Sequence, residues 1–328
     1  MKLSRQILIL CAFIASVGWA TASLGAAPLP PNADLPPYND KTCTRCHDEG
    51  ETKPIWSIYQ AKHGVRADSH APSCQSCHGG SKKHLYGDPA VKGKQAPDVV
   101  FGNRKKSDFP PSETSKQNAF CMDCHQKDAK RSHWEGSIHQ SRDLACVSCH
   151  EIHTFKDKVR DKLTQADVCF TCHKEQRAQI NRPSHHPIPE GKMACTDCHN
   201  PHGTAGVKMM KRDTVNDTCY TCHMEKRGPF VHNHEPVNDD CSTCHNPHGT
   251  TAESMLKTRP PFLCQTCPTP HGAVQPLLAG QGGATGAMSY ANGAAITQGR
   301  SCLNCHTQVH GSNNPSLTDP KNAQFYFR

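Results

Sequence analysis

Cysteine and histidine stand at one fixed spacing along most of this chain. Ten times two cysteines are separated by two residues, and nine of these pairs are followed directly by histidine. The paired cysteines are Cys43 and Cys46, Cys74 and Cys77, Cys121 and Cys124, Cys146 and Cys149, Cys169 and Cys172, Cys195 and Cys198, Cys219 and Cys222, Cys241 and Cys244, Cys264 and Cys267, and Cys302 and Cys305. The histidines that follow are His47, His78, His125, His150, His173, His199, His223, His245 and His306.

This spacing matches the covalent attachment of a c-type haem. Both sulfurs bond the vinyl carbons of the macrocycle, and the adjacent imidazole takes one axial position on the iron. Zinc knuckles also use CxxC pairs, and so do redox disulfides of exported proteins. Neither explains a histidine after nine of ten pairs when only 23 of 328 residues are histidine. We therefore predict haem c at nine sites and leave a tenth, at Cys264 and Cys267, open.

A second set of histidines is available for the opposite face of each iron. These candidate distal ligands lie near the motifs or at repeated positions, and they number ten for ten sites: His63, His84, His139, His153, His186, His202, His234, His248, His271 and His310. An iron held by imidazole on both faces has no position for a substrate, so it changes oxidation state without activating a small molecule. The pattern predicts electron transfer and no catalytic residue.

The spacing does not tell which distal histidine serves which iron. A histidine three residues beyond a proximal one, as His202 follows His199, is held on one side of its own haem. We expect it to ligate a neighbouring haem, which would tie haems together at short separation.

The cysteine pairs also belong to a larger repeat of two pairs each. A histidine precedes the first pair by 7 to 9 residues, and the unit recurs over residues 139–173, 186–223 and 234–268. The third copy ends in Pro268 where the others have a ligand histidine. Three explanations remain open. His271 replaces the missing ligand, or the site is empty with its cysteines free or disulfide-bonded, or a misread base has turned a histidine codon into a proline codon.

The N-terminal residues predict export from the cytoplasm. Lys2 and Arg5 precede an apolar run that ends at a small-residue cleavage pattern, so residues 1–22 are expected to be a signal peptide and residues 23–42 a proline-rich leader. No later stretch is apolar enough to cross a bilayer. Removing Lys2 and Arg5 lowers the formal charge from +8 to +6, spread along the chain. We therefore expect no nucleic-acid partner.

The composition predicts a fold built around its cofactors. Hydrophobic residues make up 35% of the chain, and the 21 cysteines inflate even that share. We expect a multihaem cytochrome c of mostly short helices and loops wrapped around a row of haems, with little or no sheet. Short helices are predicted within residues 164–180, beginning near Thr164 and Asp167. Loops are predicted over residues 85–118 and 272–300.

Several long motifs make the chain resemble the MtrA/DmsE family of periplasmic decahaem cytochromes, with the relatives MtoA and PioA. The resemblance covers about residues 43–311. The motifs that carry it are VNDTCYTCHMEKRGP at 215–229, CHNPHG at 198 and 244, MLKTRPPFLCQTC at 255–267, and GRSCLNCHTQVHGSN at 299–313.

The resemblance implies a row of bis-histidine haems in two five-haem halves, here residues 43–190 and 191–328. It also implies a periplasmic conduit inside an outer-membrane β-barrel partner, exchanging electrons with periplasmic or inner-membrane cytochromes and with an extracellular multihaem cytochrome or mineral. Fe(III) reduction and Fe(II) oxidation both fit. A polar, irregular chain cannot face lipid directly, which favours such a sheath. The alternatives are a soluble periplasmic shuttle and a multihaem reductase with an open iron near Pro268.

Overall fold

A computed structural model describes residues 40–48, 50, 55–65, 67–102, 109–267, 303 and 308–313. The predicted signal peptide and nearly all of the leader lie outside these residues, as do His271, His306 and the loop at 272–300.

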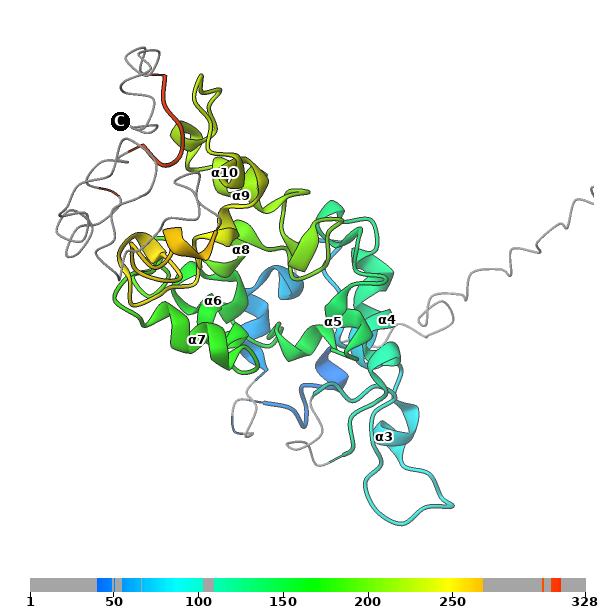
Figure 1. The fold of residues 1–328 in the computed structure, drawn as a ribbon. Helices are drawn as coiled ribbons and strands as arrows, with labels where there is room; N and C mark the ends of the chain where they lie inside the picture. Colours follow the sequence, from blue (N-terminus) through cyan, green and yellow to red (C-terminus); the bar gives the residue numbers. More distant parts are fainter. Residues whose placement is uncertain are drawn as a thin grey trace, which may run out of the picture.

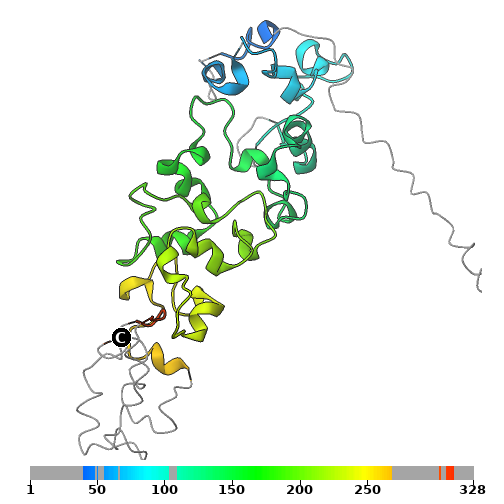
Figure 2. The ribbon, with the colours of Figure 1, turned by 90° about the horizontal axis from the view of Figure 1, so that it is seen from above.

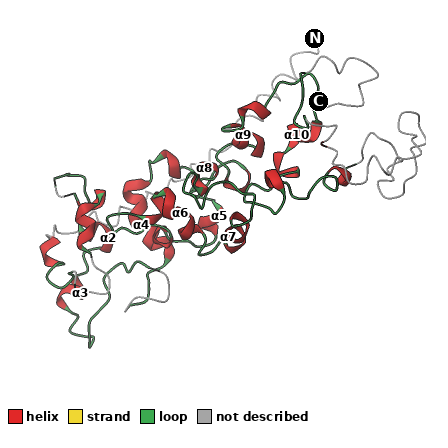
Figure 3. Ribbon diagram, turned by 90° about the vertical axis from the view of Figure 1, so that its left-hand side faces the viewer, coloured by secondary structure: helices red, strands yellow, loops and turns green. Residues whose placement is uncertain are grey.

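The described part of the chain is long and runs in sequence order from one end to the other. Its N-terminal motifs lie at one end, and the segments around α9 and α10 lie toward the other (Figure 2). The same elongated arrangement is seen from the side, where α2 and α3 lie far from α10 (Figure 3). Successive motifs are therefore neighbours in space as well as in sequence.

Short helices joined by loops make up this fold, and no strand occurs among the described residues. The α-helices, most of which Figure 1 labels, are α2 (Cys74–His78), α3 (Lys82–Tyr86), α4 (Thr114–His125), α5 (Ile138–Ser141), α6 (Lys162–Cys169), α7 (Lys174–Ile180), α8 (Cys195–Cys198), α9 (Val215–Tyr220) and α10 (Glu235–Asp239). Single turns of 3-10 helix lie between them, among them η5 (Cys146–Ser148), η6 (Lys158–Arg160), η9 (Cys241–Thr243) and η11 (Cys264–Thr266). The predicted helix-and-loop fold is confirmed.

Two predicted boundaries differ from the structure. The helix expected near Thr164 begins two residues earlier, as α6, because the carboxylate of Asp161 accepts the backbone N–H of Leu163 at 3.0 Å and caps the first turn. The loop expected over residues 85–118 ends at Glu113, where α4 begins. In both places a helix extends ahead of its cysteine motif.

The polypeptide buries few apolar side chains of its own. Within the described residues, the buried apolar set is Val99, Val100, Phe120, Trp134, Ala145, Phe170, Ile180, Ala194 and Ala252. Large apolar side chains such as Leu163 and Phe155 remain mostly exposed on the protein alone. This apolar core is small for a chain of this length, which agrees with the prediction that cofactors fill much of the interior.

Candidate haem-binding site

Each described attachment motif folds as one helical turn that gathers its functional side chains. In six of them the backbone N–H of the histidine donates to the carbonyl of the first cysteine, at 2.9 to 3.1 Å. These are the turns at His47, His150, His173, His199, His223 and His245. The turn brings both thiols and the proximal imidazole of a motif close together.

The structure brings the predicted proximal and distal histidines together in pairs. Eight pairs have ring centroids 5.9 to 6.3 Å apart. The pairs are His47 with His84, His78 with His153, His125 with His63, His150 with His202, His173 with His139, His199 with His248, His223 with His186, and His245 with His310. Eight of the ten candidate distal histidines are thus placed opposite a proximal one.

The separation of the paired rings fits one metal ion between them. A metal–imidazole bond of about 2.0 Å, with about 1.1 Å from the bound nitrogen to the ring centre on each side, places two axial centroids about 6.2 Å apart. The observed 5.9 to 6.3 Å matches this value in all eight pairs. Rings in direct contact have centroids about 4.5–7 Å apart. An iron between the rings is favoured because the separation stays in a narrow range, at 5.9 to 6.3 Å, while the interplanar angle varies from 11° to 71°.

The pairing follows a rule that links motifs distant in sequence. In the first relation, a histidine three or four residues after the proximal histidine of an even-numbered motif faces the proximal histidine two motifs earlier. His202, after the sixth motif, thus faces His150 of the fourth. In the second relation, a histidine that precedes an even-numbered motif faces the proximal histidine of the next odd-numbered motif. His139, before the fourth motif, thus faces His173 of the fifth. His153, His248 and His310 obey the first relation, and His63 and His186 obey the second.

The cysteines connect the motifs in sequence order. The first thiols of successive motifs lie within hydrogen-bonding reach in four places: Cys43 with Cys74, Cys121 with Cys146, Cys169 with Cys195, and Cys219 with Cys241. The second thiols are electrostatic neighbours at the four junctions between: Cys77 with Cys124, Cys149 with Cys172, Cys198 with Cys222, and Cys244 with Cys267. Hydrogen-bonding first cysteines and electrostatically neighbouring second cysteines therefore alternate from the first motif to the ninth.

Polar side chains that the sequence reasoning missed fix alternate junctions. The backbone N–H of Cys146 donates to the side-chain oxygen of Asn118 at 2.8 Å, and that of Cys241 donates to Asn216 at 2.6 Å. Asp40 accepts from Cys74 in the same way. Each acceptor stands three residues before the first cysteine of the preceding motif, a recurring polar position that was visible in the sequence. Gln165 bonds Thr196 at the fifth junction.

Backbone carbonyls orient many of the paired imidazoles. The Nδ1–H of His199 donates to the carbonyl of Lys208 at 3.1 Å, and that of His245 donates to Ser254 at 2.8 Å. Lys208 and Ser254 both adopt left-handed backbone angles, with φ of 51° and 54°. Such strain in non-glycine residues is typical of functional positions. A fixed Nδ1–H leaves Nε2 of the same ring as the metal-binding nitrogen.

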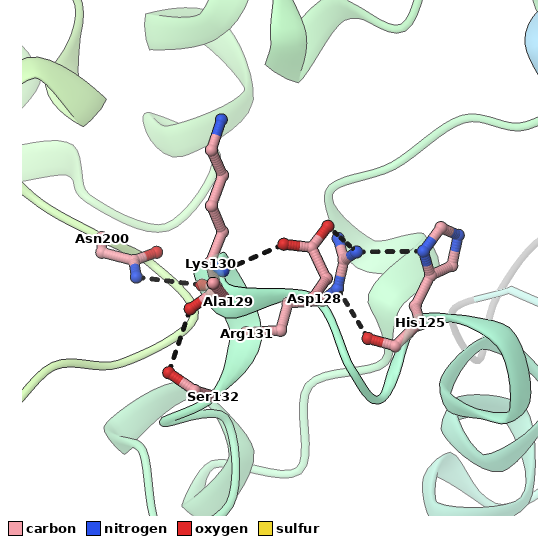
Figure 4. Close-up of polar contacts among 7 residues, drawn as sticks. All are labelled: His125, Asp128, Ala129, Lys130, Arg131, Ser132 and Asn200. Carbon is pink, nitrogen blue, oxygen red and sulfur yellow. Dashed lines mark hydrogen bonds and ion pairs between the residues drawn. The ribbon is translucent and has the colours of Figure 1, made fainter.

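Two neighbouring proximal histidines face charged groups instead. His150 donates from Nδ1 to the Asp157 carboxylate at 2.7 Å. Nδ1 of His125 lies 2.9 Å from a guanidinium nitrogen of Arg131, which also pairs with Asp128 (Figure 4). The same loop contacts a later segment, because Asn200 donates from its side chain to the carbonyl of Lys130 at 3.0 Å (Figure 4).

Burial keeps several of the paired imidazoles neutral. It lowers the pKa of His78, His199 and His248, and it lowers the pKa of His202 to about 4. Only the neutral ring has a lone pair for a metal. The fold therefore favours the ligand form of these side chains near neutral pH.

The ninth motif departs from the other motifs in its backbone. Cys267 is extended, with φ −112° and ψ 150°, whereas Cys149 and Cys244 are helical at the same position, with ψ of −35° and −32°. Proline disfavours helical angles in the residue before it and has no N–H to close the turn. The substitution at Pro268 thus changes the turn as well as removing an imidazole.

Although the ninth motif lacks its histidine, the candidate distal ligand His234 makes the same kind of hydrogen bond as two of the paired distal histidines. Its Nδ1 lies 3.1 Å from the carbonyl of Val309, directly before His310. His139 and His186 bond the carbonyls of Pro201 and Pro247 in the same way, directly before His202 and His248. His139 and His186 face the proximal histidines of the fifth and seventh motifs, so the equivalent position of His234 corresponds to the ninth motif.

Other metal chemistry finds less support. The described residues contain no cluster of three or more metal-binding side chains, and their histidines gather in twos. All described cysteines are free of disulfides. No helix in the described ranges is long and apolar enough to cross a membrane.

Covalent attachment motifs, paired imidazoles and a helix-and-loop fold define a multihaem c-type cytochrome, an electron-transfer protein. Comparisons with known proteins agree. The doubled CXXCH motif matches residues 185–228 and 234–270, and the family of NrfB-like c-type cytochrome proteins matches residues 74–164.

The chain belongs to the MtrA family of multihaem cytochromes. It is 42% identical to the multiheme cytochrome MtrA of Shewanella baltica, over 85% of this chain and 80% of the relative. It is also 28% identical to the cytochrome c-type protein NrfB of Haemophilus influenzae, over 53% of this chain and 84% of that protein. The resemblance predicted from the long motifs is confirmed.

Proposed function

We propose that this protein is a conduit that passes electrons along haems arranged in single file. The observation that carries the proposal is the series of neighbouring cysteines from Cys43 to Cys267, with one pair at each of the junctions between these nine motifs and in sequence order. Haems attached at touching motifs lie close to one another, and electron tunnelling between them falls off exponentially with distance. A row without gaps therefore conducts along its whole length.

The axial ligands support transfer rather than catalysis. An iron between the imidazoles of each of the eight pairs would be held on both faces and would have no open position for a substrate. The haem supplies a one-electron couple, and the side chains of this chain hold it, orient it and set its surroundings. We propose no catalytic residue in the described part of the chain.

The ninth site is proposed to carry a haem as well. Cys244 and Cys267 are electrostatic neighbours, so the series of cysteine pairs reaches this motif, and the bond of His234 to Val309 matches those of the paired His139 and His186. With the site at residues 302–306 this gives ten haems. Mass spectrometry of the mature holoprotein tests the number, and the C264A/C267A double variant should weigh one haem less. A variant with the same number of haems as the wild type would show that the site is empty.

The second ligand at the ninth iron decides between two functions. An imidazole such as His271 would leave a pure conduit, whereas an iron open to solvent would support the alternative of a multihaem reductase. Carbon monoxide added to the reduced protein separates the two, because it binds only ferrous haem with a free or weakly held position. We favour the closed site, since the eight described pairs are all saturated.

The cellular setting is proposed from the family. The chain is placed in the periplasm after removal of residues 1–22, with an outer-membrane β-barrel protein as partner and other cytochromes at either end. The length of the described fold supports a role in which electrons cross a distance (Figure 2). Co-purification with a barrel from detergent-extracted membranes tests this setting. Release of the holoprotein from washed membranes without any partner would favour the soluble shuttle instead.

A further inference from the structure

The proximal histidine of the fourth motif has an unusual hydrogen-bond partner. Six paired imidazoles in the described residues direct Nδ1 to a neutral backbone carbonyl: His78, His84, His139, His186, His199 and His245. His150 instead directs Nδ1 to the carboxylate Oδ2 of Asp157, at 2.7 Å. Among these seven rings, only His150 donates its Nδ1 hydrogen bond to a negatively charged acceptor.

The Asp157 carboxylate is held in place and shielded from water. Its side chain is 14% exposed and that of His150 is 29% exposed. Its other oxygen, Oδ1, accepts the backbone N–H of Glu151 at 3.3 Å, and residue 157 stands at the start of the helical turn η6. The neighbouring cation Lys156 pairs with Asp161, so its charge is directed to a different carboxylate.

A carboxylate acceptor changes the ligand more than a carbonyl does. A hydrogen bond to an ionised acceptor is about twice as strong as one between neutral groups. It draws the Nδ1 proton away from the ring and makes Nε2 more basic, and a more basic ligand stabilises the ferric iron, which has the greater positive charge. The negative charge itself acts in the same direction through a medium of low polarity.

We propose that Asp157 is a positioning residue that lowers the reduction potential of the haem bound at Cys146 and Cys149, relative to haems whose ligands face carbonyls. This inference rests on the proposed conduit, in which that haem is the fourth of the row. The fourth haem is then reduced less often than its neighbours. Electron transfer onto it is unfavourable in free energy, and transfer from it to the next haem is favourable.

Charged groups lie beside both the third and the fourth haem. Arg131, on the preceding motif, bonds the proximal His125 of the third haem and pairs with Asp128 (Figure 4). It is also an electrostatic neighbour of His202, which faces His150. Arg160, on η6, and Asp157 itself are both neighbours of the distal His63 of the third haem. The hydrogen bond of Asp157 is to His150, so the fourth haem is expected to respond most to its removal.

The test is a potentiometric titration of the D157N holoprotein, followed by its visible spectrum. Asparagine keeps the size and one acceptor oxygen but removes the charge, so the bond falls from charge-assisted to neutral strength. We expect the ferrous-to-ferric ratio of one haem, at fixed solution potential, to rise about tenfold, which equals about 59 mV for a one-electron couple. The low-spin ferric EPR signal of one haem should change with it.

Two variants separate this effect from structural damage. D157E retains a carboxylate and should restore most of the wild-type titration. D167N removes an exposed carboxylate on α6, for which no contact with an axial histidine is seen among the described residues, and it should leave every potential unchanged. Unchanged potentials in a fully loaded D157N protein, or an equal shift in D167N, would overturn the inference. If D157N loses the haem while D157E keeps it, Asp157 acts in retaining the haem rather than in setting its potential, and the inference is overturned as well.

The readouts are independent of the conduit proposal. Haem number by mass spectrometry and a low-spin spectrum test whether the row is built as proposed. The potential of a single haem tests Asp157 alone. A correct haem number with an unshifted potential therefore removes the role of Asp157 and leaves the conduit intact.

Discussion

The imidazoles of His150 and His202 face each other almost in parallel, with 6.1 Å between their centroids and 11° between their planes. They belong to the fourth and sixth motifs, so this pair crosses the boundary predicted at residue 190 between two five-haem halves. His186 and His223 also face each other across this boundary, but here the proximal histidine, His223, lies after residue 190. The division into halves remains a prediction, and these contacts bring candidate ligands from motifs on both sides of it together.

Replacing His202 by alanine should open the fourth iron. Cys146, Cys149 and His150 still attach the haem, so the number of haems should not change. About one haem in ten should become high-spin and bind carbon monoxide when reduced, because bis-histidine ligation is lost at one site. His70→Ala is the matched control, since His70 is fully exposed and bonds only Asp68 among the described residues. A low-spin H202A spectrum would contradict the pairing.

Gly203→Ala should displace the loop that carries His202. Gly203 has φ of +102°, and a Cβ there would collide with the backbone carbonyl of His133. We expect a loss of unfolding free energy of about 1–3 kcal/mol from the backbone strain, and more from the collision. Gly136→Ala is the control, because Gly136 has φ of +81° and open space around it. Equal losses of stability in thermal unfolding would mean that the collision contributes nothing.

Asn216→Leu should loosen the junction between the seventh and eighth motifs. Asn216 is 7% exposed, accepts from the N–H of Cys241 and donates to the carbonyls of Val237 and Asn238. These bonds are part-buried, so leaving their groups without partners costs at most about 1–3 kcal/mol each. Denaturant unfolding measures the loss, with Asn181→Leu as control, because Asn181 is exposed and makes one local bond to Arg177. If Asn216→Leu is as stable as Asn181→Leu, the hydrogen bonds of Asn216 do not stabilise this junction.

Pro268→His should give the ninth motif the ligand and the backbone N–H of the others. The number of haems should remain that of the wild type, and any high-spin ferric EPR signal should disappear, because the new imidazole lies opposite His234. A gain of one haem by mass spectrometry would instead show that the wild-type site is empty. The change also frees Cys267 from the constraint that proline places on its backbone.

The fold could be predicted from the sequence in outline but not in its boundaries. The CxxCH spacing and the small apolar share predicted helices and loops around cofactors. The start of α6 was missed because Asp161, rather than Thr164, supplies the capping oxygen. The junction residues Asn118 and Asn216 were missed because their partners lie in the next motif, more than twenty residues along the chain.

The sequence alone determined the attachment chemistry, since two cysteines and a histidine within one helical turn meet wherever the chain goes afterwards. It also supplied the distal histidines as a set, and with them the class of electron-transfer protein. Only the tertiary structure decided that His202 faces His150, that His139 faces His173, and that cysteine contacts join the motifs in order. The physical reason is range: a helical turn is fixed by neighbouring residues, whereas opposing ligands come from segments whose approach depends on how successive motifs pack.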